Sequence, residues 1–340
     1  MATMGMEIGG AETHVLELAR ALRRRGFNVF VASNGGVYEK DLEAAGIKHY
    51  KLPLHNKKLS NMIASYKGLK QIIVKEKIDI VHGHARIPSF LCGLLHKKMK
   101  FPFITTAHWV FKINPILRQM TDWGQLTVAV SNDIKTYLID NYQVPASDIS
   151  VTINGIDTDK FSNQIDASSV EAEFDLTPDK TRIVYVSRMD TSRSLVAHHL
   201  VQIAPKLDAQ IDNLEIVIVG DGDDFENLKA EVQQINTQQG RSLIKLTGGR
   251  TDINKFIKTG DIFVGVSRSA LEAMAAEKPS IIAGNEGYIG IFDESKLDDC
   301  IRTNFCCRDC RVPSAKLLYE DIITLLKNTD AQTRAQLGAY

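Results

Sequence analysis

Residues Arg182–Arg193, RIVYVSRMDTSR, indicate the fold of this chain most directly. A β-branched apolar run typical of a buried strand ends here in a polar loop, and a helical pattern follows. Such a strand–loop–helix unit builds parallel sheets, which bind ligands at the carboxyl ends of their strands. Arg188 and Arg193 stand at such an end, where two guanidinium groups suit a diphosphate. The alternative is that both are ordinary surface arginines.

The same alternation of strand and helix occurs in both halves of the chain. In the first half, helical patterns such as Ala11–Arg25 separate expected strands at Phe27–Ala32, Ile78–Val81, Phe103–Thr106 and Leu126–Val130. In the second half, strands are expected at Arg182–Val186, Leu214–Val219, Ile244–Leu246, Ile262–Gly265 and Ser280–Ala283. This alternation predicts two α/β domains, residues 1–155 and 156–328, each with a parallel sheet. The polar segment Asn154–Pro178 fits a hinge between them.

Both ends of the chain are expected to be incomplete. Only Met1–Met4 precedes the first glycine pair, which leaves a very short opening strand. Leu317–Lys327 has the apolar spacing of a last domain-packing helix, and the chain stops soon after it. Residues 329–340 are therefore interpreted as the truncated start of a C-terminal tail.

Composition predicts a cytoplasmic protein without a membrane span. The 340 residues contain no apolar run of the ~20 residues that cross a bilayer, and no signal peptide at the start. The net charge is zero, yet residues 1–155 hold 20 Lys and Arg against 12 Asp and Glu. This excess indicates an anionic partner, such as peripheral contact with an anionic membrane, or simply an unevenly charged surface. No nucleic-acid partner is expected.

Two further segments place glycines or hydroxyl groups at helix starts. Gly9 and Gly10 precede a long helix, where backbone N–H groups are available to an anion, although the turn could be purely structural. Ser267, Arg268 and Ser269 likewise follow a strand and begin an alanine-rich helix. Its positive end would attract phosphate, and a glutamate one turn later could accept hydrogen bonds from ribose hydroxyls. By contrast, the turn at residues 220–224, GDGDD, is interpreted as a strand end and helix cap, because its aspartates would repel a pyrophosphate.

Taken in order, these motifs resemble family 4 glycosyltransferases over nearly the whole chain. The motifs that carry the resemblance are GGAE at 9–12, VSND at 130–133, NGID at 154–157, SR at 187–188, VGDG at 219–222 and LEAMA at 271–275. The resemblance implies a GT-B fold, with two Rossmann-like domains facing each other across a cleft. It also implies that the N-terminal domain binds the acceptor, that the C-terminal domain binds the nucleotide sugar, and that transfer retains anomeric configuration without a metal or other cofactor.

The resemblance also implies roles for individual residues. Arg188 and Arg193 would hold the donor diphosphate, Gly9 and Gly10 would approach the donor phosphates, and Ser267, Arg268 and Ser269 would complete the donor site. Glu272 would bind the ribose, and His108 would be the catalytic histidine, although His82 and His84 compete for that role.

Two positions depart from the family pattern. Arg193 replaces the usual lysine, and Val264 stands where the family has the first glutamate of a pair, which leaves the identity of the donor sugar open.

The resemblance implies a retaining glycosyltransferase. It would move a sugar from a nucleotide sugar, UDP-linked by expectation, to a cell-envelope glycan or lipid-linked acceptor. The resemblance implies that the departing phosphate deprotonates the acceptor, which suits a sequence without an obvious carboxylate pair. The alternatives are a sugar-nucleotide 2-epimerase and a non-catalytic nucleotide-sugar binding protein of the same fold.

Four cysteines gather near the C-terminus, at Cys300, Cys306, Cys307 and Cys310. Their spacing contains one CxxC and lacks the second pair of a zinc ribbon. Free thiols are therefore preferred over a zinc or iron–sulfur site.

Overall fold

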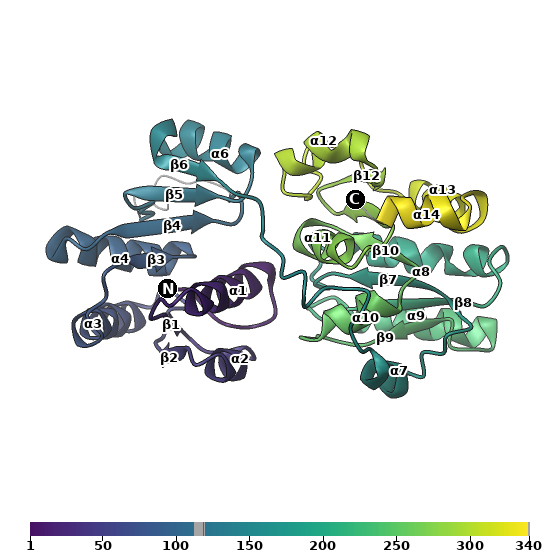
Figure 1. Ribbon diagram of the computed structural model, residues 1–340, viewed down its shortest axis with the longest axis horizontal. Helices are drawn as coiled ribbons and strands as arrows, with labels where there is room; N and C mark the ends of the chain where they lie inside the picture. The colour runs from purple at the N-terminus through teal and green to yellow at the C-terminus, as the bar shows by residue number, and fades with distance from the viewer. Residues whose placement is uncertain (112–117, 119, 339–340) are drawn as a thin grey trace. The chain divides into compact units, whose positions relative to one another are not determined.

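The computed structural model describes residues 1–111, 118 and 120–338, and the chain forms two compact units, Met1–Gly155 and Ile156–Tyr340 (Figure 1). In the first unit the strands are β1 (Phe30–Ser33), β2 (Lys48–Lys51), β3 (Val81–Gly83), β4 (Phe103–Ala107), β5 (Leu126–Ala129) and β6 (Ile149–Val151). Its helices are α1 (Gly10–Arg24), α2 (Glu39–Ala44), α3 (Leu59–Lys75), α4 (Arg86–Met99) and α6 (Asn132–Tyr142).

The first unit contains a parallel sheet that is joined at its centre by a single residue. Strands β1 and β2 pair with each other, and β3, β4, β5 and β6 follow one another in order. Ala2 bridges both groups, pairing in parallel with Ala32 of β1 and Gly83 of β3. The opening strand expected at Met1–Met4 is thus reduced to this bridge.

Apolar residues cover both faces of the first sheet. Successive residues of β1 point to opposite faces, so Val31 packs with α1 and α2 while Ala32 packs with α3 and α4. Phe103 of β4 is buried in the second of these clusters. Burial on both faces explains why these strands have continuous apolar runs.

The second unit has a six-stranded sheet in the order β12-β11-β10-β7-β8-β9. Its strands are β7 (Thr181–Val186), β8 (Leu214–Val219), β9 (Ile244–Leu246), β10 (Ile262–Gly265), β11 (Ser280–Gly284) and β12 (Gly287–Ile291), all parallel except β12. The helices are α7 (Ser168–Phe174), α8 (Leu195–Asp208), α9 (Phe225–Gln239), α10 (Ile253–Thr259), α11 (Ser267–Ala275), α12 (Leu297–Arg302), α13 (Ala315–Ile323) and α14 (Ala331–Gly338).

Two apolar clusters cover the two faces of this sheet. Ile183 and Tyr185 of β7 pack with α8, α9 and α13, whereas Val184 and Val186 pack with α7, α10 and α11. The expected packing helix at Leu317–Lys327 is α13 followed by a π-helical turn, Thr324–Asn328. Leu337 of α14 also packs on the first cluster.

Three expectations need correction. Strand β1 begins at Phe30 rather than at Phe27, which is exposed after the turn at Gly26. Strand β3 is shifted to Val81–Gly83, because Val81 is the residue that pairs with Phe103. The expected hinge Asn154–Pro178 contains helix α7, whose Val170 is fully buried in the second unit.

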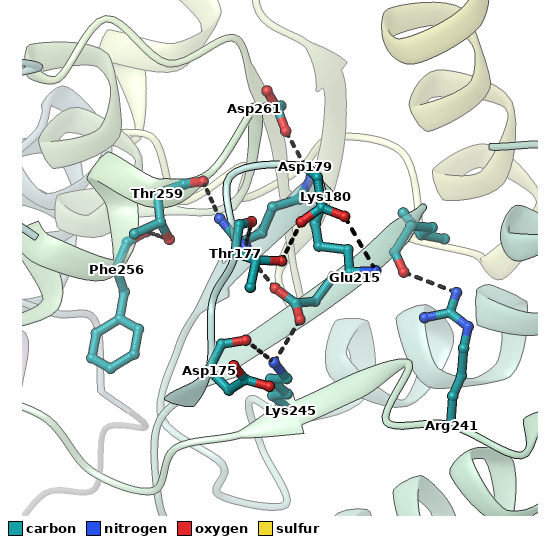
Figure 2. A network of polar contacts seen from close by, with 12 residues as sticks. Asp175, Thr177, Asp179, Lys180, Glu215, Arg241, Lys245, Phe256, Thr259 and Asp261 are labelled. Atoms are coloured by element: carbon teal, nitrogen blue, oxygen red, sulfur yellow. Dashed lines mark hydrogen bonds and ion pairs between the residues drawn. The ribbon is translucent and has the colours of Figure 1, made fainter. Parts of the chain in front are cut away.

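A buried ion-pair network ties together the amino ends of the second unit's strands (Figure 2). Arg182 of β7 donates from Nε to Glu215 of β8 over 2.7 Å, and its other nitrogens donate to the carbonyl oxygens of Thr177 and Thr259. Lys245 of β9 lies 2.6 Å from the second carboxylate oxygen of Glu215. An open groove of about 940 Å³ lies beside this network, lined in part by Glu215, Arg241 and Lys245. It is at the amino ends of the strands, opposite to the end where parallel sheets bind ligands.

The helices of the described part of the chain include none that combines the length and the apolar character needed to cross a bilayer.

Candidate functional site

Arg188 and Arg193 follow the carboxyl end of β7, and both bind one carboxylate oxygen. Oδ2 of Asp190 lies 2.9 Å from a guanidinium nitrogen of Arg188 and 2.7 Å from one of Arg193. The two arginine side chains are 46% and 37% exposed, so a ligand can reach them. Because they share one oxygen, the two cations lie close enough to bind one diphosphate. Asp190 is the anion that they bind in the absence of a ligand.

The glycine turn after β8 packs directly against the loop that carries these arginines. Met189 donates its N–H to the carbonyl of Asp221 over 3.0 Å, and Asp224 donates its N–H to the carbonyl of Met189 over 2.9 Å. A Cβ on Gly220 would stand 1.8 Å from the carbonyl oxygen of Ser187. The turn therefore holds the arginine loop in position.

The prediction that this turn caps the following helix is wrong for the side chain of Asp224. Asp224 occupies the position before α9 but caps no N–H group of that helix. Instead its carboxylate accepts hydrogen bonds from Ser194, His198 and Asn227, which lower its pKa to about 2. Asp224 thus joins the turn to the start of α8, immediately after the arginine loop.

The start of helix α11 lies beside the carboxyl end of β7. The hydroxyl of Ser269 donates to the carbonyl oxygens of Val266 and Val186 over 2.9 and 3.2 Å, and the second of these belongs to β7. The N–H of Ser267 donates to Phe305 over 2.7 Å, with Ser267 in the left-handed region at φ 55°. The structure therefore brings this predicted segment next to the arginine loop, but the groups named here already bind protein atoms.

Arg268 and Glu272 form a buried pair within α11. The two residues are 6% and 2% exposed, and Nε of Arg268 lies 2.9 Å from Oε1 of Glu272. Among the described residues, one terminal nitrogen of Arg268 is buried without a hydrogen-bond partner. The predicted ribose ligand is thus held by a neighbouring cation, and Arg268 lies inside the unit.

In the first unit, Gly9 precedes α1 and Gly10 is its first residue. Gly9 has extended backbone at φ −178°, and apart from the adjoining residues and the backbone of α1 no described atom lies within 4 Å of the position that a Cβ on Gly10 would take. The space at this helix start is open, as the predicted approach of a ligand requires.

The three histidines that are candidates for the catalytic role, His82, His84 and His108, lie close together in the structure. His108 follows β4, and its Nε2 is 3.3 Å from Nδ1 of His84, which follows β3. The rings of His82 of β3 and His84 are tilted against each other with centroids 4.0 Å apart, and Nε2 of His82 is 2.7 Å from the hydroxyl oxygen of Thr106. His14 of α1 joins this group, with its ring centroid 4.9 Å from that of His108.

Burial keeps part of this histidine cluster neutral. It lowers the pKa of His82 to about 3, and it lowers the pKa of His84 well below the usual range. At neutral pH each of these rings is therefore neutral and has one nitrogen lone pair that can accept a hydrogen bond or bind a metal ion.

The four clustered cysteines are free thiols and three of them are buried. Burial raises the pKa of Cys300 to about 12 and raises that of Cys307 further. Among the residues that the structure describes, these sulfurs do not form a group whose ligand atoms converge, whereas His14, His84 and His108 do. The metal-free interpretation of the cysteines stays a prediction.

Sequence reasoning missed Asp190 and His14. The sequence analysis assigns no role to Asp190, and its spacing of two and three residues from the arginines is the signal that could have found it. His14 lies in the first turn and a half of the helix that follows Gly9 and Gly10, and that position was the signal that could have found it.

Comparison with known proteins adds independent evidence. Residues 8–160 match the family model for Glycosyltransferase Family 4, and residues 168–340 match that for Glycosyl transferases group 1. A curated relative is the Escherichia coli UDP-Gal:alpha-D-GlcNAc-diphosphoundecaprenol alpha-1,3-galactosyltransferase, 28% identical over 68% of this chain and 63% of that protein. The chain spans about 60% of the length of the first curated relatives it matches.

Two solved structures have the same fold over nearly the whole chain. A glycosyltransferase from Rickettsia africae has a TM-score of 0.74 at 24% identity, covering 99% of this chain and 91% of that one. Anabaena HepE in complex with UDP-glucose has a TM-score of 0.74 at 17% identity, with the same coverage of both chains. The fold is therefore GT-B, with one Rossmann-like domain in each unit. The chain belongs to the family 4 glycosyltransferases.

Proposed function

We propose that this chain is a retaining glycosyltransferase that moves a sugar from a UDP-sugar to a cell-envelope glycan or lipid-linked acceptor. The observation that carries the proposal is the pair formed by Arg188 and Arg193 on one oxygen of Asp190. The relative from Escherichia coli is named for transfer from UDP-Gal to a diphosphoundecaprenol-linked sugar, and HepE binds UDP-glucose. In this proposal the second unit binds the donor and the first binds the acceptor.

The chemistry follows from where charge develops. Departure of the sugar leaves negative charge on the diphosphate, and two fixed cations stabilise that charge as it forms. Phosphate would displace Asp190 from the arginines, so the carboxylate keeps them in place without a donor. His108 is proposed as the catalytic histidine on the acceptor side, and no metal is assigned to the transfer itself.

Incubation of the full chain with candidate UDP-sugars tests the proposal against its two alternatives. A transferase hydrolyses its donor slowly and releases UDP faster when an acceptor is added. A 2-epimerase would interconvert sugars, and a binding protein would leave every donor intact; either result would overturn the proposal.

Arg188→Ala is expected to weaken UDP binding by about 1.5–3 kcal/mol, because a charge-assisted contact is lost. Isothermal titration with UDP measures this change. Arg241→Ala is the matched control, since Arg241 also pairs with an aspartate but lies by the groove at the amino ends of the strands. Equal UDP affinity in wild type and Arg188→Ala would contradict the clamp.

We further infer that the first unit contacts an anionic membrane at the cytoplasmic face. Exposed lysines lie on α3 and α4, two helices that pack against each other: Lys67, Lys70, Lys75, Lys97 and Lys98. Lysines near an anionic surface contribute about 1 kcal/mol each, or roughly fivefold in affinity.

Flotation with phosphatidylglycerol vesicles should recover the protein, and the double substitution Lys67→Glu and Lys70→Glu should reduce recovery. Equal recovery with neutral phosphatidylcholine vesicles would contradict this inference.

A further inference from the structure

Three histidines of the first unit direct ring nitrogens toward one point. One nitrogen from each of His14, His84 and His108 lies within 4.8 Å of one nitrogen from each of the others. The three residues come from α1, the end of β3 and the end of β4, so the sheet and its first helix hold them in place. No other group of three His, Cys, Asp or Glu residues in the described ranges shares this arrangement.

The geometry points to a binding site for a divalent first-row transition metal ion, such as Zn²⁺, at His14, His84 and His108. Three imidazoles with one open position are a known ligand set for zinc. With metal–nitrogen bonds of about 2.0–2.1 Å, tetrahedral ligands stand about 3.3–3.4 Å apart. His84 and His108 already have nitrogens 3.3 Å apart. The ring nitrogen that His14 contributes lies within 4.8 Å of the other two and must move closer for all three to bind one ion.

A buried unsatisfied atom supports a ligand role for His84. This residue is 3% exposed, and its Nε2 has no hydrogen-bond partner among the residues described. An orphaned buried polar atom costs about 1–3 kcal/mol, and an ion or water is a usual explanation for one. An ion bound through Nε2 would satisfy this orphaned atom and leave the contact between Nδ1 and His108 in place, whereas the 3.3 Å spacing applies to an ion bound through Nδ1.

The ligand type decides which ions fit. Neutral imidazole suits zinc, copper, nickel and iron, whereas magnesium and calcium require oxygen ligands. The fourth histidine, His82, lies 2.7 Å from the hydroxyl oxygen of Thr106, and this contact holds its Nε2 away from the ion. Water or a small ligand would fill the fourth coordination position.

Titration of the full chain with Co²⁺, after removal of any histidine tag, tests the site directly. Four-coordinate cobalt has a strong visible d–d absorption that six-coordinate cobalt lacks. We expect one equivalent to produce that absorption and one equivalent of Zn²⁺ to abolish it. His14→Ala and His108→Ala should each weaken binding by more than the roughly 10–100-fold that loss of an outer-shell partner costs.

Two controls separate the site from general effects. His55→Ala removes an exposed histidine outside the cluster and should leave the spectrum unchanged. Zn²⁺ should raise the melting temperature of wild type and His55→Ala but not of the two ligand variants, whose own unfolding transitions show that they fold. A six-coordinate spectrum, or equal Co²⁺ affinity in wild type and His14→Ala, would overturn the site.

The site has a consequence that rests on the proposed function. Bound Zn²⁺ would occupy a ring nitrogen of His108, the proposed catalytic histidine, so Zn²⁺ should inhibit transfer and a chelator should restore it. Because the cobalt spectrum needs no substrate, it reports the metal site even where the transferase proposal fails.

Discussion

Replacing Glu215 with alanine is expected to lower the free energy of unfolding of the second unit by about 3–5 kcal/mol. Arg182 and Glu215 are 4% and 3% exposed, and Lys245 completes the network. Without the carboxylate, Arg182 and Lys245 lose the anion that lies between them at the amino ends of β7 and β9. An uncompensated buried charge costs far more than the pair itself contributes.

Chemical denaturation followed by circular dichroism measures this change. Glu173→Ala is the matched control, since Glu173 binds Arg250 in an ion pair whose carboxylate is 48% exposed. Exposed pairs contribute about 0–1 kcal/mol, so this variant should stay close to wild type. A loss below about 1 kcal/mol for Glu215→Ala would contradict the buried-network argument. UDP binding at the opposite end of the sheet should survive in the folded fraction.

The central strands could be predicted from sequence because they are buried on both faces. Residues 183–186 of β7 and 216–219 of β8 are uninterrupted apolar runs, and only a sheet covered by helices on both sides accommodates them. Three edge strands, β2, β6 and β12, were missed for physical reasons, and β6 has only the three residues Ile149–Val151. Lys48–Lys51 has exposed lysines at both ends, and Gly287–Ile291 contains two glycines, so neither has the apolar period of a strand.

The candidate site was predictable where it depends on one strand end and not where it depends on packing. Arg188 and Arg193 follow β7 directly, and chain order alone places them at the ligand-binding edge. The pairing of Arg268 with Glu272 was not foreseen, although an (i, i+4) spacing permits it. The histidine cluster joins α1, β3 and β4, and the sequence gives no distance between elements so far apart in the chain.

Gly220→Ala is expected to displace the arginine loop and to cost about 2–6 kcal/mol in total, through backbone strain and overpacking. Gly220 has φ 146°, a conformation that side chains rarely adopt, and its new Cβ would stand 1.8 Å from the backbone oxygen of Ser187. That oxygen belongs to the residue directly before Arg188. Because the contact is with backbone rather than with a flexible side chain, the loop itself must move.

Gly220→Ala should therefore weaken UDP binding, whereas backbone strain that does not move the arginine loop should leave UDP affinity unchanged. Gly240→Ala supplies the comparison: Gly240 ends α9 at φ 64°, and no described atom lies within 4 Å of its Cβ position. In this control only the left-handed backbone conformation lowers the free energy of unfolding, by roughly 1–2 kcal/mol. The variant should bind UDP as wild type does. Gly220→Ala should lose both stability and UDP affinity, because Arg188 and Arg193 no longer meet at Asp190. Unchanged UDP affinity in folded Gly220→Ala would show that the glycine turn does not position the arginines.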